Sequence, residues 1–185
     1  MMKPSISIMV TGTIALMLSG CAALTKSGDN GASNLPKPIA VAHLKGPTGR
    51  DRGRVDVFRD GAGLRLEIVA REFQTGSYGM HIHTAGKCDA PDFMSAGAHW
   101  NPAGAQHGAD NPLGAHRGDL PNLLVEAGLI GRATVTIPEA KLTGEGGLLD
   151  ADGAAFIIHA QADDLKTDPT GNSGGRVVCG VFGTE

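Results

Sequence analysis

Six of the seven histidines lie at an expected strand end or in the long irregular segment beside it; they are His81, His83, His99, His107, His116 and His159. A histidine taken singly is usually a surface or hydrogen-bonded residue, so none of them alone indicates a ligand. Their grouping favours metal coordination. Imidazole ligands without sulfur suit copper, zinc, iron or nickel better than magnesium or calcium.

His81 and His83 alternate with apolar residues on an expected strand, so both imidazoles project from one face and can hold one metal. His159 closes an expected strand far along the chain. It reaches the pair only if the fold brings the two strands together.

A second group lies in the glycine-rich segment that follows. His99, His107 and His116 precede Asp119, which stands three residues beyond the last of them. Three imidazoles and one carboxylate suit tetrahedral zinc.

The elements that must position these groups are short strands. Glycine is frequent, at 28 residues, and aromatic residues make up only 4%, which is typical of a chain with many turns. Alternating apolar residues predict about eight strands, over residues 39–45, 53–58, 64–69, 78–84, 123–127, 132–137, 154–160 and 176–181, with a turn at 60–63. The count suits an all-β antiparallel barrel or sandwich.

Two segments lack this alternation. Nearly forty residues between Thr84 and Leu123 need another source of order inside a compact domain, and metal coordination is one. Residues 163–175, rich in Asp, Gly, Asn, Ser and Thr, predict a second long loop.

The N-terminus predicts export. Lys3 precedes an apolar run over 6–18 that is too short for a comfortable membrane span. Residues 18–21, Leu-Ser-Gly-Cys, resemble the bacterial lipobox, in which the cysteine, here Cys21, is acylated. An ordinary secretory peptide with an incidental cysteine is the alternative.

These features divide the chain into a signal peptide over 1–20, a lipid-anchored flexible tether over 21–37 and one domain over 38–185. We expect a periplasm-facing protein of the bacterial envelope, and Ala22 in place of an aspartate favours the outer membrane. The net charge of -3, without a basic run, gives no reason to expect a nucleic-acid partner.

Subtracting Cys21 from the three cysteines leaves Cys88 and Cys179, an even pair in an oxidising compartment. We expect them to be bonded. Closing so long a loop stabilises a fold by roughly 4 to 5 kcal/mol in the chain-entropy model.

Six segments together resemble the copper-zinc superoxide dismutases, and the resemblance spans residues 39–183. Residues 79–83, Gly-Met-His-Ile-His, are similar to the family's copper-binding strand. Residues 97–102, Gly-Ala-His-Trp-Asn-Pro, are similar to its bridging-histidine motif. The remaining matches are the zinc loop at 107–108 and 116–120, a last copper ligand in 158–164 and a C-terminal signature at 171–180.

The resemblance implies an eight-stranded antiparallel Greek-key barrel of immunoglobulin-like sandwich architecture, with a long zinc-binding loop and a shorter electrostatic loop. It implies one copper and one zinc per subunit, the copper held by His81, His83, His99 and His159 and the zinc by His99, His107, His116 and Asp119. His99 would bridge the two metals as an imidazolate.

Further roles follow from the same resemblance. Asp163 corresponds to a carboxylate that orients one histidine of each metal, and its alternative is a solvated loop acid. Arg176 would attract and orient a small anion beside copper. The loop over 163–176 is shorter than in eukaryotic members and lacks their charged cluster, which leaves Lys166 as the other candidate for guiding a substrate.

The implied activity is dismutation of superoxide in the cell envelope, with Arg176 and His99 as the catalytic residues. A copper-binding or copper-delivery module without turnover is the main alternative. A copper-only dismutase would not need His107, His116 and Asp119, and a metal-stabilised structural domain leaves Arg176 unexplained. Bacterial members of the family include both dimers and monomers, and we expect a homodimer here.

Overall fold

The computed structural model describes residues 36–185. The expected signal peptide, the lipidation site Cys21 and nearly all of the tether therefore lie outside the described residues. Within 36–185 the chain is all-β, with one short 3₁₀ turn, η1 (Met94–Ala96). No helix in this part of the chain is both long and apolar enough to cross a membrane.

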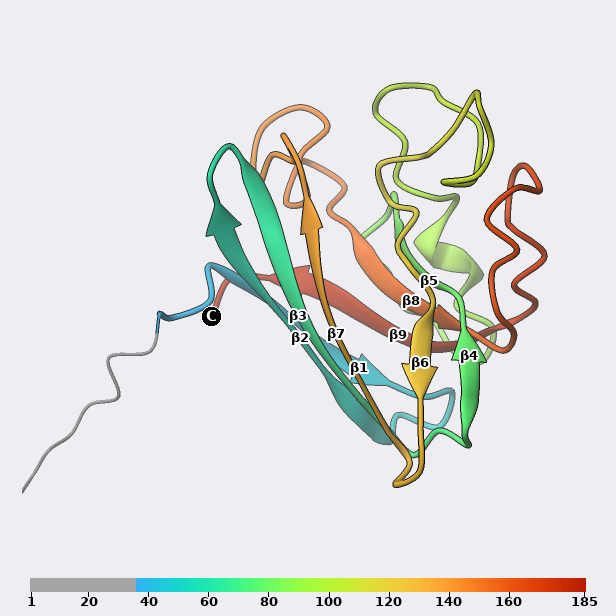
Figure 1. The fold of residues 1–185 in the computed structure, drawn as a ribbon. Coiled ribbons are helices and arrows are strands. Elements are labelled where there is room, and N and C mark those ends of the chain that lie inside the picture. The colour runs from blue at the N-terminus through green and yellow to red at the C-terminus, as the bar shows by residue number, and fades with distance from the viewer. Residues whose placement is uncertain (1–35) are drawn as a thin grey trace, which may run out of the picture. The chain divides into compact units, whose positions relative to one another are not determined.

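Nine strands form one sheet (Figure 1). They are β1 (Ala40–Lys45), β2 (Asp51–Asp60), β3 (Gly63–Arg71), β4 (Gly76–Tyr78), β5 (Met80–His83), β6 (Leu123–Val125), β7 (Ile130–Ile137), β8 (Ala155–His159) and β9 (Arg176–Gly183).

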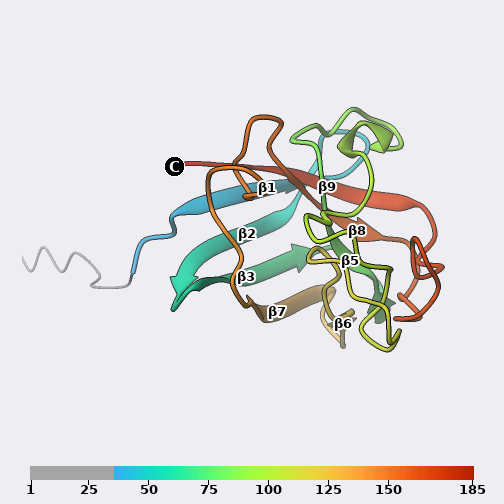
Figure 2. The same ribbon diagram turned by 90° about the horizontal axis from the view of Figure 1, so that it is seen from above.

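The sheet is antiparallel and curls into a nearly closed barrel. Its strand order is β4-β6-β7-β3-β2-β1-β9-β8-β5, and Figure 2 shows β1, β2, β3 and β7 following one another along one side. The two edge strands, β4 and β5, are consecutive in the chain. After β3 the chain crosses to β4 instead of pairing onward, as Greek-key connections do. The expected antiparallel barrel is confirmed.

The ninth strand arises where one strand was expected over 78–84. The chain pairs with β6 as far as Tyr78 and with β8 from Met80 onward. Gly79 makes the change of partner: its N–H donates to the Gln161 carbonyl at 2.7 Å, and a Cβ there would lie 2.9 Å from the Cβ of Ser173. Only glycine allows this approach.

The β2–β3 hairpin follows its alternation. Asp60 pairs with Gly63 around the expected turn. Val55, Val57 and Leu66 are fully buried. Their neighbours Asp56, Arg65 and Glu67 are partly or fully exposed, so period-two patterning sets which face packs.

β5 supplies His81 and His83, and β8 ends at His159. Both strands are buried along their whole length. Met80, Ile82 and Ile158 belong to the main core. The opposite face of β8 packs through Ile157 on a second cluster that includes Phe93 of the irregular segment.

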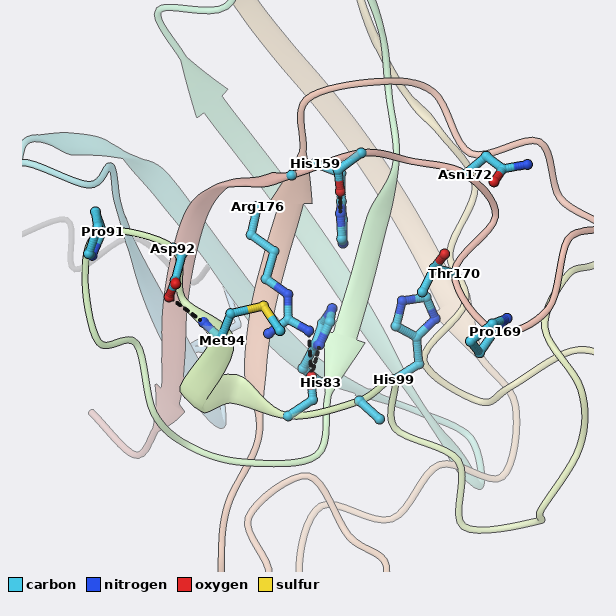
Figure 3. Close-up of a pocket in the computed structure, with 14 residues that line it drawn as sticks. His83, Pro91, Asp92, Met94, His99, His159, Pro169, Thr170, Asn172 and Arg176 are labelled. Carbon is cyan, nitrogen blue, oxygen red and sulfur yellow. Dashed lines mark hydrogen bonds between the residues drawn. The ribbon is translucent and has the colours of Figure 1, made fainter.

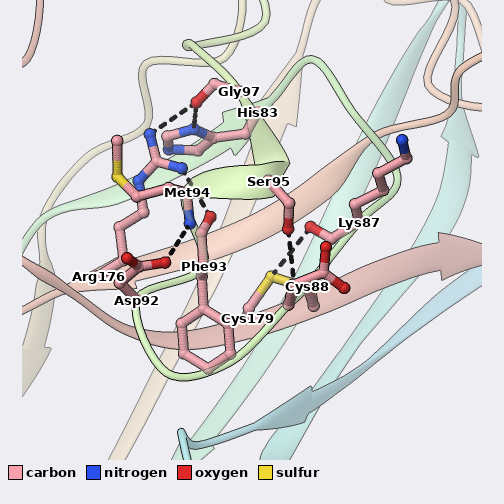
Figure 4. Close-up of a disulfide and its surroundings, with 11 residues drawn as sticks. His83, Lys87, Cys88, Asp92, Phe93, Met94, Ser95, Gly97, Arg176 and Cys179 are labelled. Atoms are coloured by element: carbon pink, nitrogen blue, oxygen red, sulfur yellow. Dashed lines mark hydrogen bonds between the residues drawn. A yellow bond between two sulfur atoms is a disulfide. The ribbon is translucent and has the colours of Figure 1, made fainter.

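The disulfide expected between Cys88 and Cys179 is present and confirms the prediction. It fastens the segment before η1 to β9, as Figure 4 shows. Phe93, only 2% exposed, packs in the same cluster as Cys179. The irregular segment is thus held against the barrel next to the histidines.

Candidate metal centre

The backbone of Ile82 on β5 holds the irregular segment at two points, Trp100 and Gly118. Its carbonyl accepts from the Trp100 N–H at 2.7 Å, and its N–H donates to the Gly118 carbonyl at 2.9 Å. A Cβ on Gly118 would lie 2.4 Å from the Ile82 oxygen, so this position needs glycine. As a result His99 lies opposite His83, and Asp119 opposite His81, in isolated bridges.

The first cluster joins these histidines to the end of β8, which pairs with β5. One ligand nitrogen from each residue lies within 4.8 Å of all the others, for His81, His83, His99 and His159. All four residues are buried. The structure therefore brings together the four residues predicted to hold copper.

Each of these imidazoles has one fixed nitrogen and one free one. His83 Nδ1 lies 2.9 Å from the Gly97 carbonyl and His159 Nδ1 lies 3.0 Å from that of Gly174. The opposite nitrogens are buried without a partner: His81 Nδ1, His83 Nε2, His99 Nε2 and His159 Nε2. Because buried polar atoms are normally satisfied, four orphaned nitrogens in one cluster fit a bound metal ion.

The second cluster converges on one carboxylate oxygen. The Nδ1 atoms of His99, His107 and His116 lie 2.9, 3.0 and 3.1 Å from Asp119 Oδ1. His107 Nδ1 makes no hydrogen bond despite this distance. Three nitrogens around one carboxylate, without sulfur, fit zinc. His99 turns Nδ1 to this cluster and Nε2 to the first.

The carboxylate of Asp163 links the two clusters, because it contacts one histidine of each. This carboxylate lies 2.5 Å from His81 Nε2 and 3.0 Å from His107 Nε2. Because Asp163 is only 4% exposed, the alternative of a solvated loop acid is wrong. Asn122 fixes its backbone: the side-chain amide donates to the Asp163 carbonyl at 2.9 Å and accepts from the Asp163 N–H at 2.8 Å.

Burial keeps His83, His99 and His159 in the neutral form that binds metal. It lowers the pKa of His83 to about 2, of His159 to about 3 and of His99 to about 4. For Asp119, burial alone would raise the pKa, but hydrogen bonds from His99 and the Gly108 N–H hold that pKa well below its usual range. The carboxylate therefore stays ionised.

A cavity of about 980 Å³ opens onto the first cluster (Figure 3). Its lining includes His83, His99, His159 and Arg176. The guanidinium of Arg176 donates to the carbonyls of Phe93 at 2.7 Å and Gly97 at 2.6 Å, which fixes a positive charge beside the free imidazole nitrogens. An anion entering the cavity meets this charge.

Several residues of this cavity were not predicted. Asp92 and Met94 line it beside Arg176, and Thr170 and Asn172 line it from the second loop, whereas Lys166 does not line it. Burial lowers the pKa of Arg176, and nearby Asp92 opposes that shift. Asn172 lies in the C-terminal signature at 171–180, whereas Asp92, Met94 and Thr170 belong to no alternating run and to no family motif.

Taken together, the fold and site define a class of protein: a nearly closed antiparallel β-barrel with two adjoining clusters of potential metal ligands, both of which include His99. Comparisons with known proteins identify the family within this class. Residues 52–182 match the family model described as copper/zinc superoxide dismutase, so the chain belongs to that family. The resemblance found in the sequence is confirmed, and the protein binds copper and zinc.

Three relatives illustrate the match. The Cu-Zn superoxide dismutase of Caulobacter vibrioides is 41% identical over 147 residues, 77% of this chain and 84% of the relative. The superoxide dismutase-like protein YojM of Bacillus subtilis is 48% identical over 128 residues, which span 66% of this chain but only 64% of the relative. A crystal structure of a SOD-like protein from the same organism, a double mutant whose two substitutions both introduce histidine, has a TM-score of 0.73 at 44% identity. That match covers 76% of this chain and 95% of the solved one.

Proposed function

We propose that this protein catalyses the dismutation of superoxide to oxygen and hydrogen peroxide. The observation that carries the proposal is the four-histidine cluster, of which His83, His99 and His159 line a cavity together with the fixed guanidinium of Arg176. Family membership supports the same reaction at a coarser level, because relatives such as that of Caulobacter vibrioides are named superoxide dismutases.

Copper held by His81, His83, His99 and His159 would supply the one-electron redox chemistry, and zinc a fixed positive charge on the far side of His99. The chain's own residues bind and orient the anion and hold the proton. Arg176 attracts the anion and places it at the cavity floor. His99 holds and releases a proton at Nε2, because its Nδ1 is directed at Asp119.

The buried carboxylate of Asp163 keeps His81 and His107 in fixed orientations, so the two metal positions keep their geometry through the reaction. The barrel core beneath β5 excludes water from the opposite side of the cluster.

A superoxide-decay assay on the copper- and zinc-loaded protein, with metal content measured in the same sample, tests the proposal. We expect rapid decay that disappears in His83→Gln. A fully loaded protein that leaves the decay of superoxide unchanged would identify a copper-binding or copper-delivery module instead.

For location, we propose export and lipid attachment through Cys21, with the domain facing the periplasm from the outer membrane. The lipobox-like residues 18–21 support this. Labelling with radioactive palmitate should mark the wild type and not Cys21→Ser; label in both would contradict it. A homodimer stays a prediction, which sedimentation of the purified domain tests.

A further inference from the structure

Met94 is an exposed methionine at the rim of the cavity. Residues 36–185 contain two methionines, of which Met80 is fully buried in the core while Met94 is 63% exposed. Both cysteines of this part of the chain are joined in the disulfide. Among the described residues, the thioether of Met94 is therefore the one sulfur donor open to solvent.

The position of this thioether relates it to the copper ligands. Met94 lines the same cavity as His83 and His159, whose Nε2 atoms are buried and unpartnered. Figures 3 and 4 both show its sulfur beside the guanidinium of Arg176. An ion that touches the sulfur is thus already inside the cavity that leads to the histidines.

The local structure holds Met94 there and moderates the charge around it. Met94 opens η1, and its N–H donates to the carboxylate of Asp92 at 3.0 Å. Asp92 lines the cavity too, which offsets the positive charge of Arg176 for an arriving cation. The rim therefore offers a neutral soft donor next to a carboxylate.

We propose that Met94 is an entry ligand for cuprous copper. Thioethers select Cu(I) over harder ions, whereas imidazole takes either oxidation state of copper. Cu(I) first binds the sulfur of Met94, and this bond is then replaced by bonds to Nε2 of His83 and His159, with no change in oxidation state. The inference rests on copper binding and not on turnover.

The test measures copper uptake by the zinc-loaded, copper-free protein under anaerobic conditions. Cu(I) is presented as its bicinchoninate complex, and uptake is followed by loss of the colour of that complex. We expect Met94→Leu to slow Cu(I) uptake about tenfold, which is the order of effect of losing one partner in a metal site, and to leave the final occupancy unchanged. Met94→Gln, which keeps chain length without a soft donor, should behave alike.

Cu(II) presented as its nitrilotriacetate complex provides the internal comparison, because a thioether contributes little to it. Its uptake, followed by the copper absorption band, should be the same in wild type and Met94→Leu. Equal slowing of both ions would show a change in the loop rather than loss of a ligand, and would overturn the proposal, as would unchanged Cu(I) uptake.

A matched variant controls for exposed sulfur in general. Leu124 on β6 is 61% exposed and does not line the cavity, so adding Leu124→Met to Met94→Leu restores a surface thioether at the wrong place. Cu(I) uptake should stay slow in this double variant. Recovery of the wild-type rate would overturn the assignment to Met94.

Discussion

A single backbone oxygen links two functions of this centre. The Gly97 carbonyl accepts from Arg176 at 2.6 Å and lies 2.9 Å from His83 Nδ1. The group that would attract an anion and a ligand of the copper set therefore share one support. Because Gly97 directly follows η1, a shift of η1 would displace the Arg176 guanidinium and the His83 ring together.

Arg176→Ala removes the fixed charge without removing a metal ligand. We expect both metals to stay bound, the rate constant for superoxide decay to fall at least about tenfold, and its dependence on ionic strength to weaken. Stopped-flow decay measured across salt concentrations checks this. An unchanged salt dependence would remove Arg176 from the role of attracting the anion.

Asp163→Asn replaces one of the two carboxylate oxygens that face His81 and His107 with an NH2 group, so only one of the two imidazoles keeps its acceptor. We expect the affinity for zinc to fall about 10- to 100-fold in competition with a chromophoric chelator. Asp110→Asn, in the exposed part of the zinc loop, is the matched control and should keep the wild-type affinity. Equal loss in both variants would assign the effect to loop charge rather than to orientation.

At the level of elements, the disulfide and η1 form a brace between the irregular segment and β9. Cys88 and Cys179 lie 91 residues apart in sequence, and Phe93 packs in the same cluster. The carbonyl of Phe93 also accepts from Arg176. The brace thus serves both stability and the position of the guanidinium.

Replacing both cysteines by serine should therefore have two effects. We expect the free energy of unfolding to drop by about 2 to 5 kcal/mol, because the unfolded chain regains freedom. Arg176 should also become less well placed, so the decay rate should fall at temperatures where the protein is still folded. Denaturant melts and decay rates on the same sample separate the two; a stability loss with an unchanged rate would limit the brace to stability.

The sequence predicted the elements better than their contacts. Alternation placed the β2–β3 hairpin and the strands of the core, since patterning alone decides which face is buried. It did not reveal the break at Gly79, because the residues on either side keep the same alternation while the pairing partner changes.

The histidine motifs likewise predicted which residues meet, but not what holds them. Asn122 bonds the backbone of Asp163, 41 residues later, and nothing near Asn122 marks this. Asp92 and Met94 line the cavity from the segment that the disulfide fastens to β9. Such contacts depend on the closed barrel and have no local signature.

For the molecule as a whole, the buried histidines make the metal-free protein sensitive to acid. The pKa of His83 is about 2 and that of His159 about 3, against an ordinary 6.5. Below pH 6.5 the unfolded chain binds protons that the folded chain does not, so stability falls as pH drops from 6.5 toward these values. Each group costs about 1.4 kcal/mol per pH unit.

Urea unfolding of the metal-free protein between pH 7.5 and 4.5 should show this decline. Asp119 and Asp163, whose pKa values are lowered, add a further loss only below their usual range. Removing one titrating group with His159→Gln should make the decline shallower. A stability that is constant down to pH 4.5 would contradict the neutral, buried state of these imidazoles.

The antiparallel pair of β1 and β9 separates the start of the barrel from the cavity. β1 begins where β9 ends, with Val41 paired to Gly183, while Arg176 opens β9 at the other end (Figure 1). The described chain therefore enters the barrel at the end of the β1–β9 pair that is remote from Arg176 and from the cavity that Arg176 lines.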